Sequence, residues 1–276
     1  MTAPAWCQAN VMFPNWDGAE SIAVSRLAPM LRAGEDEGSL AGWFIIRKRP
    51  CWRVRYLPAD GEAERIGQGL DALVAEGAIT GWTAIVYEPE EHAFGGAQAM
   101  ASAHRFFHQD SRSLLEHLQG KGGLHRRETS VMLCSLLMRS AGLDWYEQGD
   151  VWARVGAHRR LPPGVTPESR KRLQAAVHRL VCVNGAELMR MGGPLAHLAD
   201  WARAYADAGR DLAHLMERGL LHRGLRAVLA HHVLFAWNRI GLPYATQAVL
   251  ADAARTVVFG PDPTTERSAA NRVEDP

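Results

Sequence analysis

The sequence contains no closely spaced pair of cysteines. Its four cysteines are scattered along 276 residues, at Cys7, Cys51, Cys134 and Cys182. Zinc sites and redox dithiols are usually built from cysteines that lie only a few residues apart. The spacing therefore argues against both, and we expect reduced, buried thiols and no metal or cofactor.

A long apolar run and a net charge of either sign are also missing. No stretch reaches the roughly 20 apolar residues that a membrane helix needs. The N-terminus shows no basic segment followed by an apolar core, which is the signature of a secretory signal. The formal net charge is +1, so the chain as a whole does not attract nucleic acid or an anionic membrane. We expect a cytoplasmic protein without direct contact to either.

Tyrosine and phenylalanine are scarce relative to tryptophan. Nine tryptophans stand against five tyrosines and seven phenylalanines, in a chain of globular composition. Bulky indole rings serve either in a packed core or in the wall of an aromatic cleft. We favour core packing and keep the cleft as the alternative.

The first 95 residues alternate between β-rich runs and amphipathic helices in the order β-α-β-β-α-β. This order predicts a ferredoxin-like arrangement, in which four antiparallel strands carry two helices on one face. The expected strands cover residues 6–13, 40–49, 51–57 and 79–87, and the expected helices cover residues 21–32 and 62–76.

From residue 97 onward the apolar spacing is helical. The expected helices cover residues 97–119, 127–142, 144–158, 167–180, 195–217, 221–240 and 244–256. We therefore predict the α+β fold class, with a single domain over residues 1–260 made of a βαββαβ half (1–95) and a mostly helical half (96–260). Residues 261–276 lack apolar periodicity and are predicted to form a disordered tail.

The segment YEPEEHAFGGAQAMASAHRFFHQDS, residues 87–111, combines a strand end, an acidic turn, a Gly-Gly break and the start of a helix. Functional residues tend to collect at such junctions. Three further blocks follow or precede it: WRVRYLP (52–58), a long block that begins RRETSVMLC (126–159), and AHHVLFAWNRIGLP (230–243).

In this order, the four blocks resemble those of the thiopeptide-type bacteriocin biosynthesis proteins, which are related to the C-terminal, elimination domain of class I lantibiotic dehydratases. The match runs across most of the chain. It implies an enzyme that modifies a ribosomally made precursor peptide, and it identifies a family better than a reaction.

Arg53 and Arg55 alternate with apolar residues, so both guanidinium groups leave the same face of a strand. Two parallel cations suit an anionic group, because each offers a planar donor fork to a carboxylate. A solvated strand face is the alternative. The resemblance implies that this Arg-x-Arg pair belongs to the site that eliminates glutamate from a glutamylated serine or threonine.

Elimination also requires a base, and a histidine is a natural proton carrier. The resemblance points to His231 and His232, with Arg53 and Arg55 as the other catalytic residues. The sequence departs from better-known family members in two ways. Ala93 stands where they have an arginine, and their histidine lies closer to the Asn-Arg pair than His232 lies to Asn238.

The remaining candidates are substrate-binding residues. They are expected in the 87–111 segment and in the two helical blocks, and they are Tyr87, Glu90, Phe94, Trp145, Asp150, Trp237, Asn238 and Arg239. His104 and His108 have the i, i+4 spacing of metal ligands, but no acidic third ligand accompanies them, and we expect no metal.

The leading interpretation is the small elimination component of a split dehydratase, a lyase, with a glutamylating dehydratase subunit and a leader-bearing precursor peptide as its partners. The first alternative is a pyridine synthase, which joins two dehydroalanines of a thiopeptide precursor by a formal [4+2] cycloaddition and for which the tryptophans would supply flat walls. The second is a non-catalytic subunit that holds the leader peptide, as an added strand on a sheet edge.

Overall fold

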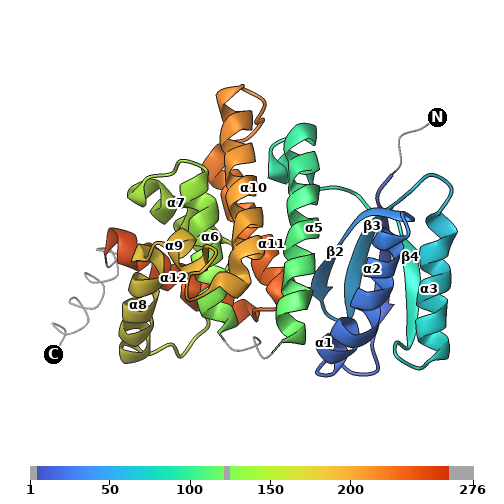
Figure 1. Ribbon diagram of the computed structural model, residues 1–276. Coiled ribbons are helices and arrows are strands. Elements are labelled where there is room, and N and C mark those ends of the chain that lie inside the picture. The colour runs from blue at the N-terminus through green and yellow to red at the C-terminus, as the bar shows by residue number, and fades with distance from the viewer. Residues whose placement is uncertain (1–4, 121–124, 261–276) are drawn as a thin grey trace.

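The computed structural model describes residues 5–120 and 125–260. Four strands form one antiparallel sheet in the order β2-β3-β1-β4. They are β1 (Cys7–Met12), β2 (Leu40–Lys48), β3 (Cys51–Pro58) and β4 (Gly81–Ile85). The sheet lies at one end of the molecule with α1 (Ala19–Ile22), α2 (Ala28–Asp36) and α3 (Ala63–Ala75), the helices that follow residue 125 lie at the opposite end, and α5 (Ala97–Gln119) stands between them (Figure 1).

One long helical stretch follows β1 and packs against the sheet. It runs through α1 (Ala19–Ile22), the π-helical η1 (Ala23–Leu27) and α2 (Ala28–Asp36). Ala19, Ala23, Leu27 and Leu31 are at most 1% exposed. A strict four-residue spacing drifts around a regular α-helix by about 40° per repeat. The wider π turn in the middle reverses this drift and keeps the four side chains on the buried face.

Helix α5 (Ala97–Gln119) seals one edge of the sheet. The backbone N–H of Trp43 in β2 donates to Nδ1 of His108 at 3.1 Å, and the N–H of Ile45 donates to the hydroxyl of Ser111 at 3.2 Å. Nε2 of His108 lies 3.0 Å from a carboxylate oxygen of Glu35. The edge of a sheet has unpaired backbone groups that can pair with other chains. At β2, side chains of α5 accept hydrogen bonds from two of these groups, and they thereby join the sheet to the helices.

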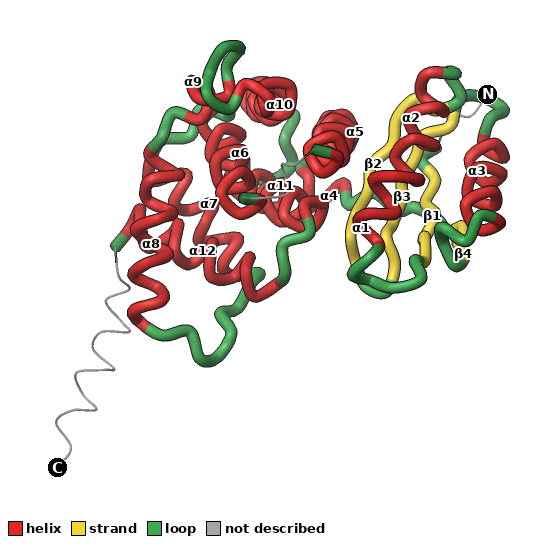
Figure 2. Tube along the Cα trace, turned by 60° about the horizontal axis from the view of Figure 1, so that its bottom comes forward, coloured by secondary structure: helices red, strands yellow, loops and turns green. Residues whose placement is uncertain are grey.

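The remaining helices pack around α6, α10, α11 and α12, as the tube in Figure 2 shows. They are α4 (Glu91–Phe94), α6 (Arg126–Ser140), α7 (Trp145–Ala157), α8 (Pro167–Cys182), α9 (Gly185–Met189), the 3-10 turn η3 (Ala196–Leu198), α10 (Ala199–Glu217), α11 (Leu225–Ile240) and α12 (Tyr244–Phe259). Helix α3 (Ala63–Ala75) instead packs against α2 and β4 at the sheet end. Only a glycine fits at Gly209 of α10, because a Cβ atom there would lie 2.4 Å from the carbonyl oxygen of Leu137 in α6.

The predicted mixture of strands and helices is confirmed, with all the described strands before residue 86 and the helices extending to residue 259. The expected helix 97–119 has the observed bounds, whereas the expected strand 79–87 is shorter at Gly81–Ile85. The short helices α4 and α9 were not expected, since a four- or five-residue helix carries too little periodicity to be recognised. The predicted tail, residues 261–276, lies outside the described residues.

The preference for tryptophans in the core is confirmed. Trp43, Trp52, Trp152 and Trp237 are at most 1% exposed. The expectation for the cysteines holds only in part: all four thiols are free and two are buried, but Cys182 is exposed near the C-terminal end of α8. Among the described residues, no helix is both long and apolar enough to cross a membrane.

Candidate functional site

Arg53 and Arg55 leave the same face of β3, as the alternation predicted. Their neighbours Trp52 and Val54 are fully buried on the other face. In the sheet, Arg53 stands between Asn10 of β1 and Ile46 of β2, and Arg55 stands between Gln8 and Phe44. Arg53 is half-buried, whereas Arg55 is only 6% exposed. The pair therefore has one inner and one outer guanidinium.

The inner guanidinium is held by side chains from three segments. Nε of Arg55 donates to Oε1 of Gln8 at 2.9 Å. Its carbon Cζ lies 4.6 Å from the centre of the Tyr87 ring and 5.4 Å from that of Phe44. Burial lowers the pKa of Arg55, and the nearby Tyr87 and Glu90 oppose this shift. An arginine stays protonated in proteins, so the site contains a fixed, shielded positive charge.

Tyr87 connects this cation to a histidine of α5. Its hydroxyl lies 2.9 Å from Nε2 of His104. The His104 ring packs at 4.4 Å between centroids against Trp6. Burial lowers the pKa of His104 to about 4, with a further contribution from the charge of Arg55. Burial raises the pKa of Tyr87 to about 12, so near neutral pH a protonated phenol faces a neutral imidazole.

We call this group the sheet-face cluster. Its outward members are the half-buried Arg53 and the exposed Glu90, whose carboxylate acts on Arg55. Nε of Arg53 has no hydrogen-bond partner among the described residues. Arg53 and Glu90 therefore form the outer rim of the cluster. The cluster consists of Gln8, Phe44, Arg53, Arg55, Tyr87, Glu90 and His104.

The segment from Tyr87 to Gly96 leads from this cluster to a second one. Its Gly-Gly break is required by geometry, because Gly95 and Gly96 have φ of 92° and 107°, which side chains other than glycine rarely adopt. The N–H of His222 donates to the carbonyl of Gly95 at 2.9 Å. A Cβ atom on Gly96 would lie 2.8 Å from Nδ1 of His222, so the two loops touch closely.

The second group, which we call the helix-side cluster, surrounds His231 on α11. Nη1 of Arg223 donates to the carbonyl of Ala93 at 3.0 Å and lies 3.4 Å from Nδ1 of His231. The ring of His158 packs edge-on against His231 with 5.4 Å between centroids. Burial lowers the pKa of His231, Arg223 and His158 lower it further, and the carbonyl of Ala227 opposes the shift.

The contact with Arg223 gives a direct prediction for His231. Replacing Arg223 by glutamine removes a positive charge next to the imidazole, so we expect the pKa of His231 to rise. The measurement is an NMR titration of the histidine side chains in both proteins. Arg226→Gln, three residues along and paired with Asp150 at 3.4 Å, is the matched control. Equal titration of His231 in wild type and Arg223→Gln would contradict the assignment.

His232, the other predicted base, is enclosed. It is 1% exposed, its ring packs against Phe94, Phe106 and Phe107, and neither ring nitrogen has a described partner. Burial lowers its pKa to about 3, with Arg239 and His231 adding to the effect. In this conformation His232 offers no surface to a peptide, and its catalytic role stays a prediction.

Arg239 is also fully buried, in an ion pair with Asp110 of α5. Asp110 accepts two further hydrogen bonds, from the indole N–H of Trp201 at 2.6 Å and from the hydroxyl of Tyr205 at 3.0 Å. This network joins α5, α10 and α11. The arginine expected to bind substrate therefore has no exposed surface and holds three helices together.

The other predicted binding residues are spread over the helical half. Phe94 is fully buried and touches His231 and His232. Trp237 stacks on Trp152 at 5.8 Å in the core, and Asn238 accepts a hydrogen bond from Gln247 at 3.1 Å. The half-buried Trp145 begins α7, and Asp150 pairs with Arg154 at 2.9 Å. Of the predicted site residues, Arg53, Arg55, Tyr87 and Glu90 come together in the sheet-face cluster, and Phe94, His231 and His232 come together on the helix side.

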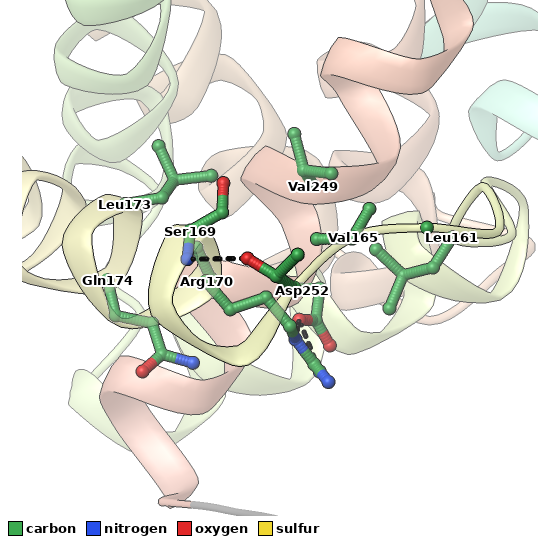
Figure 3. Close-up of a pocket in the computed structure, with 11 residues that line it drawn as sticks. Leu161, Val165, Ser169, Arg170, Leu173, Gln174, Val249 and Asp252 are labelled. Atoms are coloured by element: carbon green, nitrogen blue, oxygen red, sulfur yellow. Dashed lines mark hydrogen bonds and ion pairs between the residues drawn. The ribbon is translucent and has the colours of Figure 1, made fainter.

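Two hollows of the described surface lie in the helical half. One of about 340 Å³ lies between α8 and α12, where Figure 3 shows Arg170 and Asp252 joined by an ion pair of 2.8 Å. A larger one, about 540 Å³, lies between the ends of α6, α10 and α11. Neither of these two hollows is lined by a member of the sheet-face cluster.

No group of three or more histidine, cysteine or acidic side chains is placed to hold a metal in the part of the chain that the structure describes. The candidate metal pair is occupied otherwise, because His104 contacts Tyr87 and His108 contacts Trp43 and Glu35.

Sequence reasoning did not assign Gln8, Phe44, His104, His158 or Arg223 to the site. Gln8 precedes the arginines by more than 40 positions, and its role follows only from the pairing of β1 with β3. His104 was considered solely as a metal ligand. Arg223 lies in a loop without a recognisable motif, yet its guanidinium reaches the carbonyl of Ala93. Strand alternation could have suggested Gln8, whereas His104 and Arg223 required the tertiary structure.

The fold and the clusters describe a mixed α and β protein with a cationic sheet face. Residues 6–258 match the family of the lantibiotic biosynthesis dehydratase C-terminal domain. The chain belongs to this family. Membership supports a role in the biosynthesis of modified ribosomal peptides with antibiotic activity. A search among curated proteins gives no significant match.

Two crystal structures have a similar fold. The tRNA-dependent lantibiotic dehydratase MibB from Microbispora sp. 107891 matches over 100% of this chain with 18% identity and a TM-score of 0.65, and the chain spans 29% of MibB's length. TsrL matches over 95% of this chain and 99% of its own, with 16% identity and a TM-score of 0.63. At such identities the likeness concerns the fold alone.

Proposed function

We propose that the protein is the glutamate-elimination component of a split, tRNA-dependent dehydratase, which forms dehydroalanine or dehydrobutyrine in a precursor peptide. The observation that supports this most is the cation pair of Arg53 and Arg55 on one sheet face, with the outer guanidinium partly open. A carboxylate that leaves the peptide as free glutamate needs positive charge that is already in place.

The two arginines would divide this task. Arg53 is the half-buried, outer member of the pair, and its Nε is buried without a described partner, so the terminal nitrogens of its guanidinium bind the leaving carboxylate. Arg55, fixed by Gln8 and by the rings of Tyr87 and Phe44, stabilises the negative charge that develops when the α-proton is removed. A fixed charge needs no reorganisation at the moment of reaction.

Replacement of Arg53 by alanine tests this function. We expect elimination to slow by roughly 10²–10³-fold and the glutamylated peptide to accumulate, as followed by mass spectrometry. Arg53→Lys keeps the charge but loses the planar fork, so it should restore part of the rate. The control is Arg65→Ala, an exposed arginine of α3 paired with Glu37. Unchanged dehydroalanine formation in Arg53→Ala would rule out the assignment.

A second candidate is a pyridine synthase that joins two dehydroalanines by a formal [4+2] cycloaddition. It is favoured by Ala93, which stands where related dehydratases have an additional arginine, and by the aromatic rings of Trp6, Phe44 and Tyr87 around the cluster. Such a reaction depends on orientation of the peptide more than on strong cations. A synthetic, dehydrated, azole-bearing peptide that cyclises without any other protein would establish this function instead.

The partners follow from the chemistry. Elimination requires a substrate that another protein has glutamylated, so we propose a glutamylating dehydratase subunit and a leader-bearing precursor peptide as partners, in the cytoplasm. A protein that retains the leader in a pull-down but fails both reactions would instead be a non-catalytic binding subunit. The genes beside this one separate the two reactions, because a lone glutamylating dehydratase supports elimination and azoline-forming enzymes support cyclisation.

The ferredoxin-like description of residues 1–95 and the single domain over residues 1–260 also remain proposals. The strand order β2-β3-β1-β4 with every pair antiparallel supports the first. The second is supported by the hydrogen bonds from α5 to β2 and by a buried core that includes residues of both halves.

A further inference from the structure

We propose that Tyr87 and His104 form the proton-accepting pair of the sheet-face cluster, in which Tyr87 takes the α-proton from the peptide while its own hydroxyl proton passes to Nε2 of His104. This inference rests on the proposed elimination and supplies its base. Neither predicted base, His231 nor His232, belongs to the sheet-face cluster.

The geometry of the pair fits this role. The hydroxyl oxygen of Tyr87 and Nε2 of His104 are 2.9 Å apart, which is hydrogen-bond distance. Tyr87 is half-buried and follows the exposed residues Ile85 and Val86, and its hydroxyl contacts the mostly buried His104. His104 is 9% exposed and reaches the peptide only through Tyr87. Tyr87 is thus the catalytic residue and His104 its positioning and proton-storing partner.

The residues around Tyr87 and His104 determine the protonation state of the imidazole. Arg55 from β3 lies on the face of the Tyr87 ring at 4.6 Å, and Trp6 covers the His104 ring. Among the described residues, the titratable and charged groups that act on the imidazole are Arg55 and Tyr87. Burial and the positive charge of Arg55 both disfavour a resting imidazolium. The imidazole of His104 is therefore neutral in the resting protein, which is the form that can accept a proton.

Elimination moves one proton from the peptide to Tyr87 and one proton from Tyr87 to His104. The Cα–H bond of the glutamylated residue breaks, its proton joins the oxygen of Tyr87, and the hydroxyl proton of Tyr87 moves to His104. The electron pair of the broken bond becomes the new carbon–carbon double bond, and the carbon–oxygen bond to glutamate breaks. Glutamate leaves as a carboxylate beside Arg53, and the imidazolium of His104 returns its proton to solvent.

Three variants test the pair on a glutamylated peptide. Tyr87→Phe keeps the ring beneath Arg55 but removes the hydroxyl. His104→Gln keeps a polar side chain that cannot take up a proton. We expect both to slow elimination by roughly 10²–10⁴-fold, which is the usual contribution of acid–base catalysis. Tyr146→Phe, an exposed tyrosine of α7, is the matched control and should retain the wild-type rate. Thermal unfolding shows whether each variant is folded.

The outcomes separate this inference from the function on which it rests. If the wild type eliminates glutamate and Tyr87→Phe does so equally well, the pair is not the base although the proposed function stands. If the wild type eliminates nothing, the proposed function fails, and an NMR titration of the free protein still decides about the pair. A His104 imidazole that titrates in its ordinary range, or that does not respond to Tyr87→Phe, would overturn it.

Discussion

Asp110→Ala is expected to lower the free energy of unfolding by about 3–5 kcal/mol. The carboxylate of Asp110 is the partner of Arg239, which has no exposed surface. Its loss would leave a cation uncompensated in the core, and it would also remove the acceptor of the Trp201 and Tyr205 hydrogen bonds. Urea-induced unfolding, followed by tryptophan fluorescence, measures the change.

Two further variants make this result specific. Asp211→Ala removes a carboxylate that pairs with Arg105 at the surface at 3.0 Å, and exposed pairs contribute only about 0–1 kcal/mol. The double variant Asp110→Leu with Arg239→Met replaces the buried ion pair by apolar groups, and we expect it to recover most of the lost stability. Equal costs for Asp110→Ala and Asp211→Ala would contradict the structural role of the buried network.

Acidification is expected to destabilise the protein through His232. Burial lowers the pKa of this residue to about 3 in the folded state, whereas an unfolded histidine has a pKa near 6.5. As the pH falls, His232 is therefore protonated at a higher pH in the unfolded chain than in the folded protein. The stability is fully present above about pH 6.5 and is lost as the pH falls toward 3, by on the order of 4 kcal/mol from this group alone.

His232→Leu removes this dependence because leucine does not titrate. We expect the difference in unfolding free energy between variant and wild type to shift in favour of the variant as the pH falls, measured by urea titrations at several pH values from 8 to about 4. The remaining acid dependence of the variant includes His104, whose pKa burial lowers to about 4. A constant difference would mean that His232 is already solvated in the folded protein. Elimination by the same variant tests its predicted catalytic role.

Local sequence patterns predicted those parts of the fold that depend on neighbours along the chain. The alternation of Arg53 and Arg55 with Trp52 and Val54 is a property of any strand, and the structure has it. The apolar spacing over residues 97–119 predicted α5 with its observed bounds. The π turn at Ala23–Leu27 was not predicted, because over so few residues a four-residue spacing differs little from the ordinary helical period and the turn reveals itself only in the packing.

The candidate site was predictable to a smaller extent. Arg53, Arg55, Tyr87 and Glu90 were identified from blocks of sequence, and the structure brings these four together. Trp237, Asn238, Arg239 and His232 lie in an equally recognisable block, yet they serve packing, the Asp110 ion pair and a hydrogen bond between α11 and α12. The identity of a polar residue in a motif does not show whether its side chain faces a substrate or the core. The burial of these residues could therefore not be derived from the sequence pattern.

The sequence by itself determined the family, the mixed fold class and the cationic strand, since all three depend on residues that are close in the chain or on long blocks in a fixed order. Only the tertiary structure decided which histidine meets the arginines. His104 lies about 50 residues beyond Arg55 and reaches Tyr87 because α5 packs along the edge of β2. Such contacts depend on the way helices and strands pack in three dimensions, and that packing is settled by the burial of apolar surface over the whole chain.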